Sequence, residues 1–187
     1  MDEWLRKSVR MYNTPGHAHF LTYSCFKQRP FLKSATAKGW FIDALANGCR
    51  RHDIALWAYV IMPEHVHVLV KPRLVQYSIS KFQASVKGSV GMRALSYSKA
   101  SPKPEEYWEP YYDFQPNGTR HFRFWQRGGA YDRNISDMSD IPQVLTYIHT
   151  NPVRRGLSSC PEDWKWSSAS FYAGGNPGPL PLEFPGF

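Results

Sequence analysis

The alternation of apolar and polar residues along the chain predicts a regular succession of strands and helices. β-Forming residues from His19 to Phe26 predict a first strand. Apolar residues then recur at helical spacing from Ala35 to Arg51, which indicates an amphipathic helix. The almost wholly apolar run from Ile54 to Met62 is typical of a central, buried strand.

The residues after Pro63-Glu64 predict the next strand, with two distinct faces. Val66, Val68 and Val70 alternate with His65, His67 and Leu69. Side chains at i and i+2 point the same way, so the two imidazoles should lie side by side with Cα atoms about 7 Å apart. Two such rings can converge on one divalent ion. Two histidines on the solvent face of an edge strand would show the same short motif.

The second half of the chain begins with a predicted helix over residues 77–99, which Gly88 and Gly91 weaken. Residues 96–120 then form an insertion rich in proline and aromatic residues. An insertion of this length is usually a functional or a disordered loop. Its aromatic side chains suit stacking on nucleobases, and an ordinary lid or flap is an equally good interpretation.

Two short segments, Phe122–Arg127 and Ala130–Ile135, are separated by Gly128-Gly129 and together predict the fourth strand. A third helix is expected from about Ile141 to a stop at Arg155-Gly156. The resulting β-α-β-β-α-β order predicts an α+β fold, a ferredoxin-like sandwich in which helices cover one face of an antiparallel sheet.

The expected domain organisation is one domain with two appendages. Residues 1–18 are predicted to form a mobile or loosely docked arm, residues 19–172 the main domain with its insertion, and residues 173–187 an irregular tail rich in Pro and Gly. Residues 161–172 are expected to add a short helix. A chain of 187 residues is long enough to bury a substantial core.

Composition narrows the function classes. The formal net charge of +8 and the 16% aromatic content favour a polyanionic partner, nucleic acid before an anionic membrane. Three scattered cysteines without a C-x-x-C pair argue against a disulfide framework and a structural zinc site. No apolar run approaches the ~18 residues of a membrane span, and the first residues lack a signal-peptide pattern. A cytoplasmic protein that does not enter a membrane is expected.

The third helix carries Tyr147 and Asn151 at i and i+4, hence on one face. Pro152 is expected to kink or end the helix at Asn151, leaving that amide free to point outward. Taken alone, Tyr147 could be an ordinary core or capping tyrosine and Asn151 an ordinary helix-terminating residue.

Together these motifs resemble the single-tyrosine transposases of the HUH superfamily, in particular the REP-associated tyrosine transposases of the IS200-like group. The stretches that carry the resemblance are Met62-Pro63-Glu64-His65-Val66-His67, Arg123-Phe124-Trp125-Gln126-Arg127, Tyr131-Asp132-Arg133-Asn134-Ile135, Tyr147-Ile148-His149-Thr150-Asn151-Pro152-Val153 and Asp163-Trp164-Lys165-Trp166-Ser167-Ser168. They follow one another in order from Met62 to Ser168, within the predicted main domain of residues 19–172. The resemblance implies a catalytic tyrosine on the C-terminal helix of the ferredoxin-like fold.

The resemblance further implies a metal-dependent reaction on single-stranded DNA that lies near an imperfect hairpin. His65, His67 and Asn151 would hold Mg²⁺ or Mn²⁺, and Tyr147 would be the nucleophile that forms a 5′-phosphotyrosine link and a free 3′-hydroxyl. Relatives in this superfamily act either as monomers or as homodimers that exchange the tyrosine helix. Some carry Gln where this chain has Asn151, and an amide is a weak ligand, so loose metal binding without DNA is expected.

Several charged residues near these motifs have weaker assignments. Arginines beside the fourth strand and at the end of the third helix are candidates for DNA phosphate contacts: Arg123, Arg127, Arg133, Arg154 and Arg155. The last two could equally interact with the helix dipole. Glu64 is expected to be a plain turn carboxylate, and His149, about 200° round the helix from Tyr147, is not expected to be a ligand.

Two other function classes fit the same sequence. One is a catalytically inactive module that binds DNA hairpins, and the other is a metal-dependent hydrolase that uses an activated water. The hydrolase would not need Tyr147, so a Tyr147→Phe variant separates it from a transposase.

Overall fold

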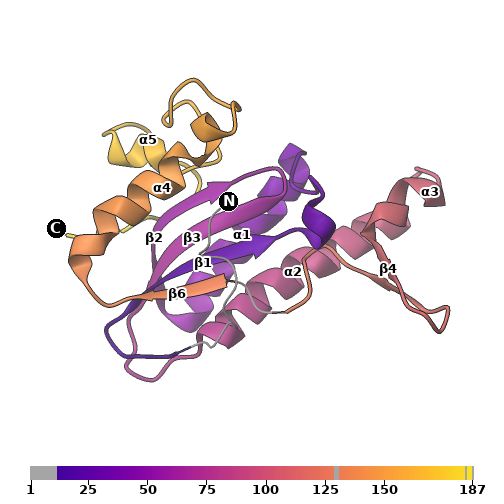
Figure 1. The fold of residues 1–187 in the computed structure, drawn as a ribbon, viewed down its shortest axis with the longest axis horizontal. Helices are drawn as coiled ribbons and strands as arrows, with labels where there is room; N and C mark the ends of the chain where they lie inside the picture. Colours follow the sequence, from indigo (N-terminus) through magenta and orange to yellow (C-terminus); the bar gives the residue numbers. More distant parts are fainter. Residues whose placement is uncertain (1–11, 129–130, 184, 187) are drawn as a thin grey trace.

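A computed structural model describes residues 12–128, 131–183 and 185–186, and it confirms the predicted α+β fold (Figure 1). Four strands form an antiparallel sheet in the order β2-β3-β1-β6. They are β1 (Ala18–Ser24), β2 (Ile54–Ile61), β3 (His65–Pro72) and β6 (Tyr131–Ile135). Helices α1 (Ala35–His52) and α2 (Ile79–Ala100) provide the two crossovers of the ferredoxin-like sandwich.

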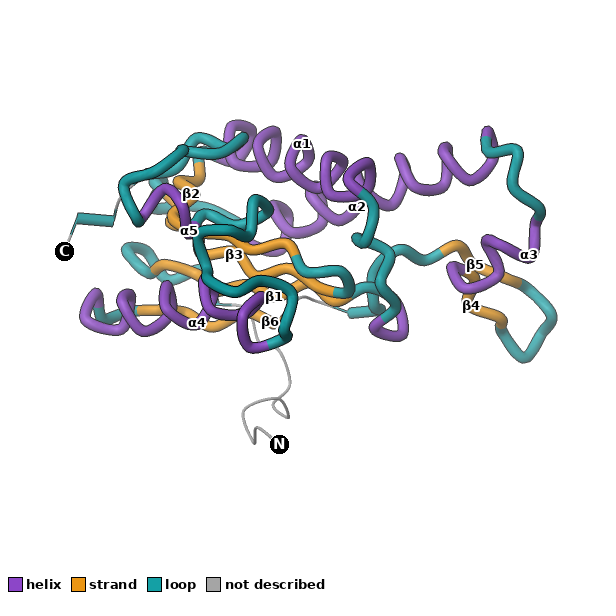
Figure 2. Tube along the Cα trace, turned by 90° about the horizontal axis from the view of Figure 1, so that it is seen from above, coloured by secondary structure: helices purple, strands orange, loops and turns teal. Residues whose placement is uncertain are grey.

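The sheet is covered on both faces (Figure 2). Helices α1 and α2 cover one face, as predicted, and α4 (Ile141–Arg154) adds a layer on the other. The three valines of β3 belong to the core under α1 and α2, whereas Leu69 packs with the buried face of α4. The alternation along β3 therefore directs His65 and His67 toward α4. β2 lies at the edge of the sheet, which corrects its prediction as a central strand. Cover on both faces explains why every residue of β2 is nevertheless buried.

Only the second of the two segments predicted as the fourth strand joins the sheet. β6 pairs with β1 over Ala18–Thr22, so only the end of β1 is left to pair with the first predicted segment, Phe122–Arg127. There, Trp125 forms an isolated bridge with Cys25. Phe124 and Trp125 are both buried although they are consecutive, which shows that this segment is an irregular core crossing rather than a strand with two faces.

The predicted 96–120 loop is ordered secondary structure. Its first residues complete α2, and α3 (Glu105–Trp108), the 3₁₀ turn η3 (Glu109–Tyr111) and a hairpin of β4 (Tyr112–Phe114) and β5 (Arg120–Phe122) follow. We call residues 101–122 the hairpin arm, because they project from the sheet (Figures 1 and 2).

Aromatic side chains attach the hairpin arm to the rest of the molecule. The Tyr111 ring stacks on Phe31 with centroids 3.7 Å apart and on Phe122 with centroids 5.4 Å apart. Trp108 is also buried. These rings pack on one another, which corrects the interpretation of the insertion as a loose flap. Tyr107 and Phe114 remain exposed, so stacking of the insertion's aromatics on nucleobases stays a prediction.

The described residues of both appendages contact the rest of the chain. Residues 1–11 of the predicted N-terminal arm lie outside the described residues, whereas Asn13 Oδ1 accepts a hydrogen bond from Ile79 N at 3.0 Å and Thr14 O accepts one from Tyr77 Oη at 2.9 Å. Of the predicted short helix only α5 (Ala169–Tyr172) forms. The described residues after Tyr172 contain no helix or strand, as predicted, yet Leu180 is buried among them.

Two further 3₁₀ turns, η2 (Phe26–Gln28) and η4 (Met138–Asp140), follow β1 and precede α4. Within the described part of the chain, no helix combines the length and the apolar character needed to cross a bilayer.

Candidate active site

The two histidines lie at the start of β3, where a tight turn follows β2. Met62 N donates a hydrogen bond to His65 O at 2.9 Å, and Cys25 N donates one to Glu64 O at 2.8 Å. The turn is thus held between β2 and the end of β1. The centroids of the two imidazole rings are 4.7 Å apart, as expected for i and i+2 side chains on one face.

Two residues of β1 hold His67 in a buried position. Its Nδ1 lies 2.8 Å from Thr22 Oγ1, and its ring stacks on Phe20 with centroids 5.3 Å apart. Burial, and then the neighbouring His65, hold the pKa of His67 well below its ordinary value, so the ring is neutral near pH 7. Its Nε2 is buried and has no hydrogen-bond partner among the described residues.

His65 contacts an acidic and an amide side chain. Its Nδ1 lies 3.2 Å from Glu64 Oε1, which in turn lies 2.8 Å from Nη2 of Arg155. Burial lowers the pKa of His65, while Glu64 and a hydrogen bond with Asn151 oppose that shift. The structure therefore brings Asn151 to the histidine pair, and it corrects the expectation that Glu64 is an isolated turn carboxylate.

Helix α4 places Tyr147 over His67. Its apolar face, formed by Ile141, Val144, Leu145 and Ile148, packs in the core on this side of the sheet. Tyr147 lies at the margin of that face and is 40% exposed. Its ring centroid is 5.3 Å from that of His67 and 5.8 Å from that of Phe20. Tyrosine and histidine thus meet at a surface that a ligand can reach.

Pro152 was expected to kink or end the helix at Asn151, and α4 does not end there; the stop predicted at Arg155-Gly156 is confirmed. The helix continues to Arg154, and Gly156, with φ of +66°, follows its end. Proline fixes φ at a helical value and removes a single amide donor, so the last turn of a packed helix tolerates it. Because the helix continues, Asn151 remains on the face of Tyr147 and is 7% exposed.

These residues fit a divalent metal ion. His67 Nε2 is a buried donor atom without another partner, and Asn151 supplies a neutral amide beside His65. No three His, Cys, Asp or Glu side chains cluster as a metal site in the described residues, so a set based on the two histidines needs a ligand of another type. Two imidazoles and an amide are suitable for a weakly held ion that keeps positions open for oxygen ligands.

The five predicted DNA-contacting arginines have different surroundings. The Arg154 guanidinium lies 5.5 Å from the Tyr147 ring centroid, and Arg155 pairs with Glu64. Arg133 Nη2 lies 3.1 Å from Asp140 Oδ2 at the start of α4. Arg123 does not flank β6, because it pairs with Asp113 in the hairpin arm at 2.5 Å.

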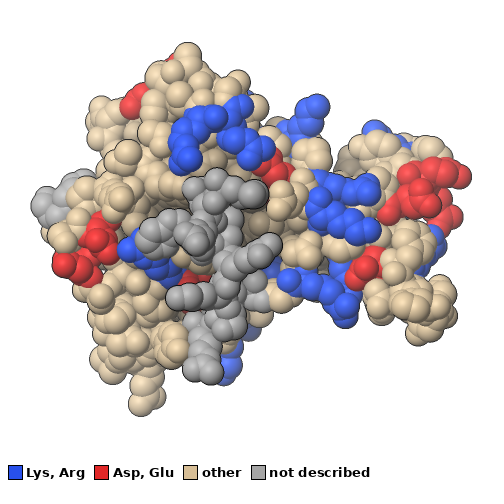
Figure 3. Space-filling view, viewed as in Figure 1, with Lys and Arg blue, Asp and Glu red and all other residues tan. Residues whose placement is uncertain are grey.

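Arg127 is exposed near the point where the hairpin arm leaves the sheet. Figure 3 shows Lys and Arg side chains gathered in this region. A hydrogen bond from Arg123, and then the charges of Arg123, Arg127 and Lys27, lower the pKa of Asp113. These three basic side chains therefore lie close enough to Asp113 to interact with it, and a phosphate contact by Arg127 stays a prediction.

Sequence reasoning missed Phe20 and Thr22. Their roles arise from pairing between β1 and β3, which places Thr22 opposite His67. Thr22 follows the same two-residue alternation as the other residues of β1, so the sequence pattern gives no sign of its contact with His67. Only the register between β1 and β3 could have revealed that contact. His149, which was not expected to be a ligand, has its Nε2 2.9 Å from Ser168 Oγ.

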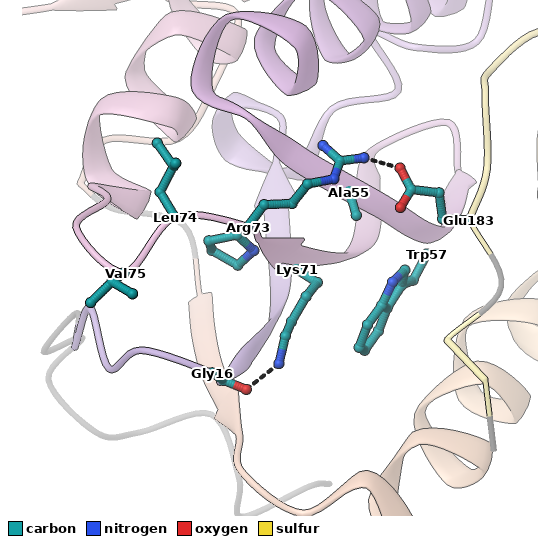
Figure 4. A pocket seen from close by; sticks show the side chains of 9 residues that line it. Gly16, Ala55, Trp57, Lys71, Arg73, Leu74, Val75 and Glu183 are labelled. Atoms are coloured by element: carbon teal, nitrogen blue, oxygen red, sulfur yellow. Dashed lines mark hydrogen bonds and ion pairs between the residues drawn. The ribbon is translucent and has the colours of Figure 1, made fainter.

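A separate hollow of about 390 Å³ opens at the far end of β3 (Figure 4). Its basic side chains are already engaged, since Lys71 donates to Gly16 O and Arg73 pairs with Glu183. None of the predicted catalytic residues lines it. The histidine–tyrosine surface is thus the better candidate for chemistry.

Comparison with known proteins agrees with this geometry. Residues 14–151 match the family model described as Transposase IS200 like. The chain therefore belongs to the IS200-like transposase family, and the matched segment runs from the docked N-terminal residues to Asn151.

Within that family, the chain is similar to REP-associated tyrosine transposases. It is 24% identical over 147 residues to a Haemophilus influenzae protein assigned to that group, covering 73% of this chain and 76% of the relative. Its fold matches a solved structure of a REP-associated tyrosine transposase bound to a REP hairpin, with a TM-score of 0.67 and 18% identity over 97% of this chain and 95% of the other. The resemblance noted from the motifs is confirmed.

Proposed function

We propose that this chain cleaves and rejoins single-stranded DNA next to a hairpin, with Tyr147 as nucleophile and Mg²⁺ or Mn²⁺ bound by His65, His67 and Asn151. One observation carries the proposal. A half-exposed tyrosine from α4 lies with its ring centroid 5.3 Å from that of a buried histidine of β3, whose Nε2 has no partner in the described residues. A purely structural tyrosine would not explain that donor atom.

The reaction follows from the groups present. Tyr147 Oη attacks the scissile phosphorus and loses its proton, while the bond from phosphorus to the 3′-oxygen breaks and that oxygen takes up a proton. The products are a 5′-phosphotyrosine and a free 3′-hydroxyl. The exchange conserves the phosphodiester bond energy, so a 3′-hydroxyl can reverse it and join strands. When bound, the divalent ion would withdraw charge from the phosphate and orient it.

Residues around Tyr147 support the nucleophile. The Arg154 guanidinium, 5.5 Å from the Tyr147 ring centroid, stabilises the negative charge that develops on the phenol oxygen. The rings of Phe20 and Tyr147 meet edge to face, with 87° between their planes, and this contact restricts how the phenol ring can rotate. The tyrosine is thus held while its hydroxyl remains accessible.

The DNA partner is proposed from charge and from the relative. The formal net charge of +8 suits a nucleic acid, and the similar REP-associated enzyme was solved with a REP hairpin. Arg127 and Arg154 are exposed and suit phosphate contacts. Since α4 packs on the sheet of its own chain, the site is complete within one subunit, which supports a monomer over a homodimer that exchanges the helix.

The proposal is tested with a single-stranded hairpin labelled separately at its 5′ and 3′ ends, incubated with Mn²⁺ and run on a denaturing protein gel. A 5′-phosphotyrosine retains the 3′ part of the DNA, so only the 3′ label should migrate with the protein. The band should disappear in Tyr147→Phe. Cleavage without a labelled protein band would favour the metal-dependent hydrolase, and binding without cleavage the hairpin-binding module.

A further inference from the structure

Glu64 connects the histidine pair to the end of α4 through one carboxylate oxygen. Its Oε1 lies 3.2 Å from His65 Nδ1 and 2.8 Å from Arg155 Nη2. The Glu64 side chain is 14% exposed and that of Arg155 is 56% exposed. The carboxylate is therefore largely withdrawn from water, and Arg155 reaches it from the surface.

A carboxylate in this position requires compensation. Removing a charged group from water is unfavourable unless paired or hydrogen-bonded groups replace the lost hydration. Here the compensation comes from His65 and Arg155 at once. Strand alternation does not govern the direction of Glu64, because this residue lies in the turn that precedes β3.

The contact decides which ring nitrogen of His65 carries its proton. A carboxylate only accepts hydrogen bonds, so the nitrogen beside it must be Nδ1–H, and Nε2 then keeps its lone pair. Thr22 Oγ1 occupies the same position beside Nδ1 of His67, at 2.8 Å. Both imidazoles thus have an oxygen at Nδ1, which is the arrangement that prepares Nε2 for a metal ion.

We propose that Glu64 is a positioning residue that holds the proton of His65 on Nδ1 and thereby presents Nε2 as a ligand. The inference rests on the metal site of the proposed function and adds a residue outside the ligand set. It also assigns Arg155 to Glu64, as the cation that balances the carboxylate, rather than to a DNA phosphate.

A simpler electrostatic effect must be separated from this role. Removing Glu64 leaves Arg155 uncompensated, and that cation alone would repel a divalent ion. Three variants distinguish the loss of the hydrogen-bond acceptor from the loss of the negative charge. Glu64→Gln loses the charge but keeps an oxygen that can accept from His65 Nδ1–H, whereas Glu64→Met fills a similar volume with no such acceptor. The double variant Glu64→Met/Arg155→Met removes both charges and the acceptor.

Mn²⁺ binding measured by calorimetry on the full chain gives the first readout. Glu64→Met should raise the Mn²⁺ Kd by about 10–100-fold, as loss of such an outer partner usually does. Glu64→Gln should stay much closer to the unmodified protein, and the double variant should remain as weak as Glu64→Met. Glu183→Ala, which also loses an arginine partner but outside the site, is the control and should bind normally.

Nitrogen NMR of the imidazoles in the metal-free protein gives the second readout. His65 should be protonated at Nδ1 in the unmodified protein and in Glu64→Gln, and should move toward the Nε2–H form in Glu64→Met. Glu64→Ala repeats the comparison if the methionine variant does not fold.

The inference is wrong if His65 keeps its Nδ1 proton in Glu64→Met, or if the double variant recovers normal Mn²⁺ affinity. Failure of the proposed function has a different signature. In that case the unmodified protein would bind Mn²⁺ no better than His67→Ala, which would overturn the metal site and the inference together.

Discussion

Ser168 anchors α4 to the edge of the sheet through one buried hydroxyl, and its removal gives a quantitative test of the fold. Ser168 Oγ accepts a hydrogen bond from Tyr59 N at 2.9 Å and donates to Tyr59 O at 3.2 Å. It also lies 2.9 Å from His149 Nε2, on the helix that carries Tyr147. Because the hydroxyl has a single proton, His149 must be the donor in that contact.

The cost of Ser168→Ala follows from those partners. Alanine removes the oxygen but almost no volume, so the stability is lost through missing hydrogen bonds rather than through a cavity. Two buried donors, Tyr59 N–H and His149 Nε2–H, lose their acceptor, and each such loss costs about 1–3 kcal/mol. The free energy of unfolding should therefore fall by about 2–6 kcal/mol, equivalent to roughly 4–24 °C in Tm for a chain of this size.

Urea unfolding followed by circular dichroism measures the change. Ser98→Ala is the matched control, since the Ser98 hydroxyl donates only to Leu95 O within α2, at 2.8 Å. That control should change the free energy of unfolding by less than about 0.5 kcal/mol. A loss below about 1 kcal/mol in Ser168→Ala would show that this hydroxyl does not anchor the tyrosine helix.

Three further predictions concern the site and the DNA. Thr22→Val removes the oxygen at Nδ1 of His67 and should raise the Mn²⁺ Kd about 10–100-fold by calorimetry; an unchanged Kd would contradict the role of Thr22. Arg154→Gln should slow covalent adduct formation by Tyr147 roughly tenfold in single-turnover assays. The effect should be smaller than that of losing a buried hydrogen-bond donor, because solvent screens the charge of Arg154, and an unchanged rate would refute this stabilisation. Arg127→Ala should weaken hairpin binding equally for different sequences and reduce the slope of log affinity against log salt by about one; an unaltered slope would exclude a phosphate contact.

The sequence predicted those parts of the fold in which apolar and polar residues alternate with the period of one strand or one helix. The two-residue period of β3 placed the valines and the histidines on opposite faces, and the i, i+4 spacing placed Tyr147 and Asn151 on one face of α4. Each pattern depends only on local backbone geometry, so it can be read without knowing the partners.

Features that depend on contacts between distant segments were not predictable in this way. Proline and aromatic composition suggested a loop at 96–120, but stacking of Tyr111 on Phe31, eighty positions earlier, makes the segment ordered. Glu64 acquires its role only because the end of α4 brings Arg155 to it. Pro152 is tolerated because packing of α4 on the sheet outweighs the loss of one backbone hydrogen bond.

The central claim is that Tyr147 forms the covalent bond to DNA, and peptide mapping tests it most directly. The protein is reacted with Mn²⁺ and hairpin DNA, digested with protease and nuclease, and searched by mass spectrometry for a tyrosine that carries a nucleotide through its 5′-phosphate. The modified residue should be Tyr147, and Tyr147→Phe should yield none. Cleaved DNA with no modified tyrosine, or an adduct on another residue that persists in Tyr147→Phe, would contradict the claim.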